Sequence, residues 1–329
     1  MKITPFLLFL TLIFLSGCST RQYFDPDDVT YGFDKKIITT PSYIKTYNSN
    51  GATTQDNRVL NRFGISKFKL PLGYEFLNYA KNGILAANKN GKLLLFDQNI
   101  TFEFKSNVVA ATQNGDMLAL VFANNSFGLY NIKEKSFKLK KYEKASFAND
   151  IRIASPVFFN RFILFPTLNG KVQVVNKNNY KVVKTLTIDP KSEVNNIILL
   201  KIIDDVIIAA SPNKLVVINN GKLYSKKFFI QSYLIDDKNI YIATLDGRII
   251  KYDLKLKELN SKKFKFAKIQ ALAIDSSKNI YAFESAGYLI KLSNDFKKTT
   301  IYNFPLENDE IIYTNGSKVY FENKVMNLN

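Results

Sequence analysis

From Val59 onward, short runs of apolar residues alternate with polar turn signals, and no run keeps a helical period. One pattern recurs within this alternation: a glycine or asparagine, then four or five mostly apolar residues, then a small polar residue. It occupies residues 91–97, 125–131, 170–176, 213–219, 247–253 and 287–293, and it fades at 316–322. Glycine and asparagine adopt the left-handed backbone of a tight hairpin turn most readily. Each copy therefore predicts a hairpin turn that leads into a buried strand.

The copies begin 29 to 45 residues apart, a spacing close to the roughly 40–50 residues of a β-propeller blade. The two clearest copies, 230–252 and 269–292, each predict three strands, and a lysine-rich fourth strand follows at 262–266 and 297–302. Four antiparallel strands per repeat make one blade. The repeat therefore indicates an all-β propeller.

Seven such units are countable along the chain. We predict a β-propeller of about seven four-stranded antiparallel blades over residues 58–329, and eight blades if residues 31–66 contribute strands. Lys67–Leu70 resembles an outer strand without a blade of its own. It would complete the last blade and close the ring, which removes open strand edges. We expect residues 18–57, which are polar, to form a tether and an irregular segment.

The start of the chain is typical of an export signal. Lys2 precedes the apolar run Phe6–Leu15, which is too short to span a bilayer as a helix. The run ends in Leu-Ser-Gly-Cys at residues 15–18, which resembles the lipobox of bacterial lipoproteins.

In that family the signal is cut off before the cysteine, and the cysteine thiol is diacylated. The resemblance implies a signal peptide at 1–17, cleavage between Gly17 and Cys18, and a lipid anchor on Cys18. Ser19 follows where the family's inner-membrane retention signal would place Asp, which favours the outer membrane. The alternative is a buried free cysteine at the end of a transmembrane anchor.

The composition restricts the chemistry. The chain of 329 residues has one cysteine and no histidine. Nucleophilic sites that use a histidine base and histidine-ligated zinc are therefore excluded. Adjacent carboxylates occur at Asp204-Asp205 and Asp236-Asp237, where we expect solvated turns rather than a pair that flanks one substrate bond. We predict no enzymatic activity, no cofactor and no metal site.

The formal net charge is +18, nearly all of it from lysine. Such a charge attracts anionic lipid headgroups, lipopolysaccharide or acidic proteins. Compositional drift in an AT-rich genome is the alternative, because asparagine and isoleucine are abundant too. We exclude nucleic acid as a partner of an exported lipoprotein.

Three of the few arginines are candidate contacts for a protein partner, because guanidinium groups bind in bidentate geometry. They are Arg152, Arg161 and Arg248. The polar residue that closes each repeat is either a cap at the strand end or part of a ring of calcium ligands. We favour the cap, since three of the five are asparagines: Asp97, Asn131, Asn176, Asn219 and Asp253.

A lipobox followed by these repeats resembles the lipoprotein propeller of the bacterial outer-membrane β-barrel assembly machinery (BamB-like) and the wider quinoprotein-type repeat family. The chain departs from the pattern by having no tryptophan. The resemblance implies a non-enzymatic scaffold, anchored by lipid to the outer membrane and facing the periplasm, that binds proteins of β-barrel assembly. Two alternatives stay open: a surface-exposed adhesin for host or matrix ligands, and a carbohydrate-binding propeller.

Overall fold

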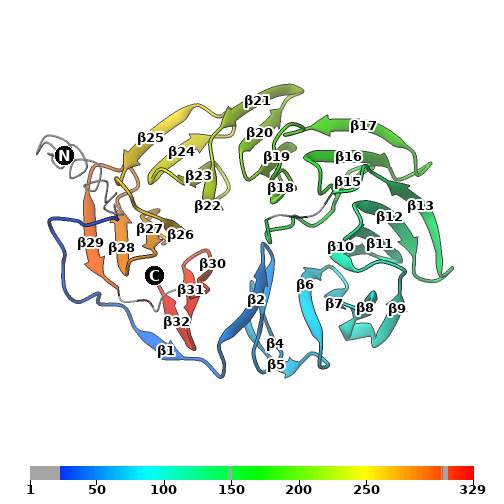
Figure 1. Ribbon diagram of the computed structural model, residues 1–329, viewed down its shortest axis with the longest axis horizontal. Helices are drawn as coiled ribbons and strands as arrows, with labels where there is room; N and C mark the ends of the chain where they lie inside the picture. The colour runs from blue at the N-terminus through cyan, green and yellow to red at the C-terminus, as the bar shows by residue number, and fades with distance from the viewer. Residues whose placement is uncertain (1–22, 147, 149, 305, 307–309) are drawn as a thin grey trace, which may run out of the picture.

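The computed structural model describes residues 23–329 except 147, 149, 305 and 307–309. Eight four-stranded antiparallel sheets form a ring around a central channel (Figure 1). In seven blades the first strand in sequence lies at the channel and the fourth at the circumference. The eighth blade has the order β1-β32-β31-β30, so its outer strand comes from the start of the described chain.

The strands of the first four complete blades are β2 (Ile44–Asn48), β3 (Gly51–Thr54), β4 (Arg58–Asn61) and β5 (Gly64–Lys69); β6 (Tyr74–Ala80), β7 (Gly83–Asn88), β8 (Lys92–Leu95) and β9 (Ile100–Glu103); β10 (Val108–Asn114), β11 (Met117–Phe122), β12 (Ser126–Asn131) and β13 (Ser136–Tyr142); β14 (Val157–Phe159), β15 (Phe162–Pro166), β16 (Lys171–Asn176) and β17 (Val182–Thr187). A 3-10 turn, η1 (Phe96–Gln98), separates β8 from β9.

The remaining strands are β18 (Leu199–Ile203), β19 (Val206–Ser211), β20 (Lys214–Asn219) and β21 (Lys222–Lys227); β22 (Ile230–Ile235), β23 (Asn239–Thr244), β24 (Arg248–Asp253) and β25 (Glu258–Lys263); β26 (Ile269–Ile274), β27 (Ile280–Glu284), β28 (Tyr288–Leu292) and β29 (Thr299–Asn303); β30 (Tyr313–Asn315), β31 (Lys318–Phe321) and β32 (Lys324–Asn327), with β1 (Ile37–Thr39).

The ring has eight blades, so the expected count of seven is corrected, and the conditional count of eight is confirmed. The additional blade is β2–β5, whose first two strands lie in the segment 18–57 that we expected to be irregular. Its repeat begins at Asn57, whose φ of 66° is left-handed. The apolar run that follows is only two residues long, Val59 and Leu60, which hides the repeat in the sequence.

Ring closure also differs from the expectation. Lys67 and Lys69 belong to β5, which pairs with β4 of its own blade. The last blade is closed by β1 instead, with Ile37 opposite Met326 and Thr39 opposite Lys324. The weak copy at 316–322 is the second strand of this blade and not the third, so it is out of register with the other copies.

The hydrophobic core lies between neighbouring blades. The second and third strands are buried along nearly their whole length, as in β11 and β23, because each is covered on both faces. Phe127 of one blade packs against Phe165 of the next with ring centroids 5.0 Å apart. The outer strands carry lysines instead, which discourage edge-to-edge pairing with another chain. The lysines on β13, β21 and β25 are Lys138, Lys140, Lys141, Lys222, Lys226, Lys227, Lys262 and Lys263.

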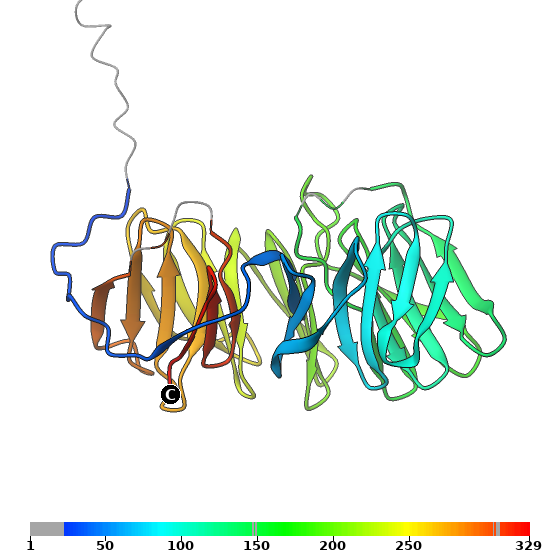
Figure 2. The same ribbon diagram turned by 90° about the horizontal axis from the view of Figure 1, so that it is seen from below.

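The disc has two faces. The connection face carries the links between blades, such as 104–107, 188–198 and 264–268, and also the turns between second and third strands. The turn face carries the other hairpin turns, such as 81–82 and 204–205. The connection face points toward the viewer in Figure 1 and upward in Figure 2, and the C-terminus lies at the turn face.

The first described residues strap the outside of the ring near the connection face. Phe24 is buried against Phe264 and Tyr288, with ring centroids 6.1 and 5.5 Å away. Thr30 bridges to Tyr302 of β29 in parallel. The chain then descends along the circumference to β1 (Figure 2). Within the described residues, no helix has the length and apolar character needed to cross a membrane.

The repeat motif acquires a second role in the structure. A Cβ atom on Gly247 would lie 2.0 Å from the carbonyl oxygen of Phe264, which follows the outer strand of the same blade. The amide of Phe264 donates to the Gly247 carbonyl at 2.8 Å. The same bond joins Phe104 to Gly91 and Leu70 to Asn57. At Gly247, glycine therefore suits both the left-handed φ and the outgoing link that passes directly over it, while asparagine takes the equivalent position at Asn57.

Candidate functional site

The central channel contains two hollows that meet near its middle. The hollow at the turn face measures about 710 Å³, and the hollow at the connection face about 760 Å³. Both are lined by the inner strands, and Ser49, Tyr233 and Thr314 line both. A channel of this size holds a loop tip or a small ligand rather than a folded domain.

Arg152 separates the two hollows. It lies on the long link between β13 and β14, and its guanidinium donates to both carboxylate oxygens of Asp150. The same group donates to the carbonyl oxygens of Ile230 and Gln231 at 3.1 and 3.0 Å. These carbonyls belong to β22, two blades further around the ring. Arg152 therefore fixes the link across the channel.

Two asparagines hold the same link from other sides. The Asn196 side chain accepts from the Asp150 amide and donates to the Arg152 carbonyl at 3.1 Å. Asn50, in the turn after β2, donates to the Ser155 hydroxyl at 2.9 Å. Residues 150–155 of the link are thus held as a partition across the channel.

Tyr233 completes the partition. Its hydroxyl donates to the carbonyl oxygen of Ile198 at 3.0 Å. Burial raises its pKa to about 12, so the hydroxyl keeps its proton well above physiological pH. The tyrosine is a structural residue of the channel wall.

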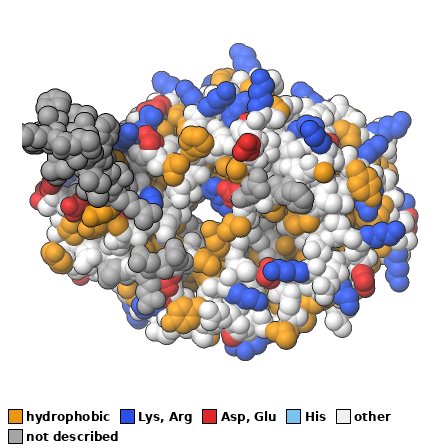
Figure 3. All heavy atoms as spheres, viewed as in Figure 1, with side chains coloured by type: hydrophobic (Ala, Val, Ile, Leu, Met, Phe, Trp, Pro, Cys, Tyr) orange, Lys and Arg blue, Asp and Glu red, His pale blue; other side chains and the backbone are white. Residues whose placement is uncertain are grey.

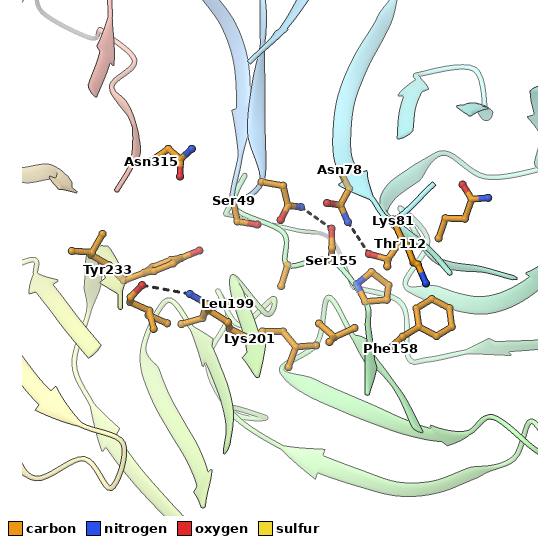
Figure 4. Close-up of a pocket in the computed structure, with 18 of the residues that line it drawn as sticks. Ser49, Asn78, Lys81, Thr112, Ser155, Phe158, Leu199, Lys201, Tyr233 and Asn315 are labelled. Carbon is orange, nitrogen blue, oxygen red and sulfur yellow. Dashed lines mark hydrogen bonds between the residues drawn. The ribbon is translucent and has the colours of Figure 1, made fainter. Parts of the chain in front are cut away.

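The turn-face hollow is polar and cationic (Figure 4). Its side chains converge from the inner strands and include Lys81, Lys201 and Asn315. Among the described residues that line it, none is a carboxylate. Burial lowers the pKa of Lys201, whose ammonium donates to the Ile235 carbonyl at the long distance of 3.4 Å. This mouth therefore favours a partner that presents acidic or carbonyl oxygens.

The connection face is different in character, because its links and turns expose large apolar side chains around the opening. They include Tyr43, Leu72, Ile151, Val194, Phe229, Leu245 and Phe266. In Figure 3, which views this face, hydrophobic side chains surround the opening, while lysines and arginines project mostly at the circumference. Among the described turn-face tips, Phe63 alone is a large exposed apolar side chain, with the Arg62 guanidinium 4.9 Å from its ring centroid.

Four of these residues form a continuous arc, which we call the apolar arc: Val194, Phe229, Leu245 and Phe266. Val194 and Phe229 line one cleft of about 590 Å³. The Leu245 amide donates to the Phe229 carbonyl at 2.9 Å. Phe266 lies in the link that covers Gly247. Gly247 is two residues after Leu245 in the same hairpin turn. The arc spans three neighbouring blades, from β18–β21 to β26–β29.

The structure places the three candidate arginines far apart. Arg152 is held in the channel, as described. Arg161 lies at the exposed turn between β14 and β15, with its guanidinium carbon 5.2 Å from the Phe162 ring centroid. Arg248 begins β24 near the connection face, where its main chain bonds to the Thr244 hydroxyl. They form no common surface.

Other expectations have clear outcomes. The local strand-end cap is confirmed at Asn131, Asn176 and Asp253, whose side chains accept from main-chain amides two to four residues later. It is wrong at Asp97, which accepts from the Ile84 amide, and at Asn219, which donates to the Leu254 carbonyl. Asp204-Asp205 is an exposed turn, and the Asp236 carboxylate accepts from the Lys238 and Asn239 amides of its own turn. No group of three or more potential metal ligands occurs among the described residues. Gly17 and Cys18 lie outside the described residues.

The sequence analysis missed the two lysines of the turn-face mouth. Lys201 carried a usable signal, because it interrupts an otherwise apolar inner strand, Leu-Leu-Lys-Ile-Ile at 199–203. A lysine at such a position has to face either the core or the channel, and only the channel solvates it. Lys81 carried no such signal, since an exposed lysine after a strand is common.

Comparisons with known proteins agree on the architecture. No protein-family model matches the chain. Among curated proteins, the plasminogen-binding protein PgbB of Helicobacter pylori strain J99 is 25% identical over 395 aligned positions, which cover 99% of this chain and 71% of the relative. PgbB of Helicobacter pylori strain 26695 matches with the same identity and coverage.

Solved structures share the fold at low sequence identity. BamB from Moraxella catarrhalis aligns with a TM-score of 0.64 and 13% identity, over 88% of this chain and 97% of that one. The C-terminal WD40 domain of Sif2 aligns with a TM-score of 0.63 and 14% identity, over 90% and 98%. The resemblance to BamB that the repeats and lipobox indicated is thus confirmed for the fold. The chain is a β-propeller similar to BamB.

Proposed function

We propose that this chain is a non-enzymatic, lipid-anchored β-propeller at the outer membrane that binds an extracellular protein of the plasminogen class. The observation that carries the proposal is the 25% identity to PgbB along 99% of the chain. The relationship extends over every blade of this chain and over 71% of PgbB. The anchor is the lipid on Cys18 that the lipobox implies, and it holds the propeller at the membrane.

The channel supports a binding role rather than catalysis. Arg152 donates to the Asp150 carboxylate and to the Ile230 carbonyl, and the Tyr233 hydroxyl donates to a main-chain carbonyl of the neighbouring inner strand's link. These bonds hold the channel wall in place. A general base has to reach a proton on a substrate, and here the Asp150 carboxylate is held by Arg152 and the Tyr233 hydroxyl by the Ile198 carbonyl. What remains accessible is a rigid rim around a cationic hollow.

We infer that the partner engages the turn-face mouth. Lys81 and Lys201 present ammonium groups to the hollow, with no carboxylate among the described lining residues. Both side chains are exposed, and a protein loop with acidic or carbonyl oxygens would pair with their ammonium groups. Affinity should then depend on salt as well as on shape.

The binding test uses purified chain and immobilised plasminogen. We expect saturable binding that weakens about tenfold in a variant with Lys81→Glu and Lys201→Glu, because both ammonium groups of the mouth are replaced by repelling carboxylates. Lys222→Glu with Lys226→Glu, on outer strand β21, makes the same change of charge at the circumference and is the matched control. Absence of binding by the unaltered chain refutes the plasminogen class. Equal loss in both variants refutes the mouth as the contact.

A second candidate is the scaffold of outer-membrane β-barrel assembly, favoured by the BamB-like fold over 88% of the chain. The two functions require opposite sides of the outer membrane. A protease added to intact cells degrades the propeller of a surface adhesin and spares that of a periplasmic scaffold. In-cell crosslinking that recovers β-barrel assembly proteins from protease-resistant chain supports the second candidate and contradicts the first.

A further inference from the structure

The apolar arc exposes more hydrocarbon than folding requires. The exposed fractions of Phe229 and Leu245 are 64% and 54%, and those of Phe266 and Val194 are 37% and 36%. These residues sit on links whose main chain is fixed by hydrogen bonds, so they could have been polar without loss of the fold. A contiguous row of this kind marks a surface that meets another apolar phase.

Lysines accompany the arc. Lys191 and Lys227 line the same cleft as Phe229, and the Lys265 ammonium lies 4.8 Å from the Phe266 ring centroid. Glu193 also lines the cleft, while the nearby carboxylate of Asp246 is paired with Lys263 at 3.0 Å. Apolar side chains surrounded by lysines suit the boundary between acyl chains and anionic headgroups.

The chain also leaves the propeller beside this arc. Phe24 packs on Phe264, two residues from Phe266 in the same link. Cys18 precedes Phe24 by six residues, which span at most about 20 Å in any conformation. A lipid on Cys18 therefore keeps this sector of the connection face within about 20 Å of the membrane.

We propose that the apolar arc rests on a membrane surface with anionic headgroups, so that the connection face turns toward the bilayer and the turn face away from it. The occupant is lipid and not a second protein. This inference rests on the acylation of Cys18 in the proposed function, and it adds the orientation. It leaves the turn-face mouth accessible to a partner.

The first experiment reads the orientation on full-length acylated chain. Leu245→Cys places a thiol in the arc, and Asn178→Cys places one on an exposed turn-face tip. Each variant reacts with a membrane-impermeant maleimide, first in detergent and then in vesicles of phosphatidylethanolamine and phosphatidylglycerol. We expect labelling of Leu245→Cys to slow by about tenfold in vesicles, because the thiol enters the headgroup boundary, while Asn178→Cys is unchanged.

The outcomes separate the possible occupants. Unchanged labelling at both sites overturns the proposal. Protection of Leu245→Cys already in detergent assigns the arc to a second copy of the chain and overturns it as well. Mass spectrometry of Cys18 reports acylation independently, so failure of the anchor is distinguished from failure of the orientation.

A second experiment removes the anchor and measures the arc alone. The chain with Cys18→Ser is sedimented with phosphatidylglycerol vesicles at low salt, where we expect weak, salt-sensitive binding. Phe229→Ser with Leu245→Ser should weaken binding by about tenfold, since both exposed apolar side chains are lost. Leu223→Ser, at a 59% exposed leucine on outer strand β21, is the matched control. Equal binding by the arc variant and the control contradicts the proposal.

Discussion

The two faces of the propeller differ in what covers their hairpins. On the connection face, each outgoing link crosses the turn between the second and third strands, as Phe264 crosses Gly247. On the turn face, no outgoing link crosses the hairpins. A Cβ atom on Gly221 would have no neighbour within 4 Å, whereas one on Gly83 would meet the Asp97 side chain at 2.2 Å. The connection face is therefore built by contacts between links and turns, and the turn face mainly by turn residues and side-chain caps.

Because of this difference, residues on the two faces differ in how many contacts constrain them and in how readily they can be replaced. The connection face fastens blades together through Arg152, Asn196 and the covered glycines, so its residues are constrained by several partners at once. Turn-face tips are constrained by their own φ angles, by caps such as Asp253 and by a few bonds between tips, such as the one that the Gly115 amide donates to the Asn82 side chain. A binding surface tolerates sequence change better on the turn face, because fewer contacts depend on each residue.

The largest expected effect comes from Arg152→Ala. It leaves the Asp150 carboxylate and two β22 carbonyls without their donor, and we expect a loss of about 4 kcal/mol in the free energy of unfolding. Arg161→Ala, on the turn face, should cost about 0.5 kcal/mol, the value of an exposed cation–π contact. Urea denaturation measures both. Similar losses in the free energy of unfolding for both variants would contradict the greater constraint on the connection face.

The second effect compares two glycines with left-handed φ angles of 79° and 74°. Gly247→Ala should destabilise the protein by about 3 kcal/mol, because the new methyl overlaps the Phe264 carbonyl in addition to the strain at φ. Gly221→Ala should cost about 1 kcal/mol, from φ alone. Thermal unfolding measures the difference. If the two variants melt together, the covering link contributes nothing.

The third effect is a loss of stability at alkaline pH. The pKa of Tyr233 is raised to about 12 from 10.0, so its contribution to stability is complete below pH 10 and is lost as pH rises toward 12. The loss is on the order of 2 kcal/mol. Tyr233→Phe removes this part of the pH dependence and also the bond to Ile198. Urea titrations at pH 9 and pH 11 measure the free energy of unfolding. If the variant loses as much of this free energy between the two pH values as the unaltered chain does, the assignment is contradicted.

The smallest effect concerns a turn-face cap. Asp253→Ala removes a carboxylate that accepts from the Lys255 and Lys257 amides. We expect a cost of about 1 kcal/mol, because these amides regain water once the cap is gone. Asp253→Asn keeps the acceptor and should restore most of the stability. A cost above that of Gly247→Ala would reverse the ranking of the two faces.

Much of the fold could be predicted from the sequence because the repeat is local. Gly91 and Gly170 start tight turns, and alternating strands and turns follow from residue type. The blade β2–β5 escaped because its strands are short and carry polar residues, with buried Thr53 and Thr54 in place of aliphatic ones. Its outer edge, Lys67 and Lys69, was recognised as a strand but given to the wrong blade.

The candidate site was predicted less well. The arginines were chosen by residue type, yet Arg152 is a structural clamp whose partners lie 78 and 79 residues away in the chain. Lys201 and Lys81 meet in the channel only because blades far apart in sequence close into a ring. The apolar arc likewise joins three links and one hairpin turn that lie 16 to 35 residues apart in the chain, and no local pattern indicates that they are neighbours.

The sequence by itself determined the strand, the turn and the blade, since each depends on backbone preferences and apolar periodicity within about forty residues. The tertiary structure alone decided the number of blades, the closure by β1 and the composition of each face. Closure brings together side chains whose separation in the chain carries no signal. The left-handed φ angle of the repeated glycine is a property of its own turn. The lack of space for a side chain at Gly247 arises only in the tertiary structure, where the link passes over it.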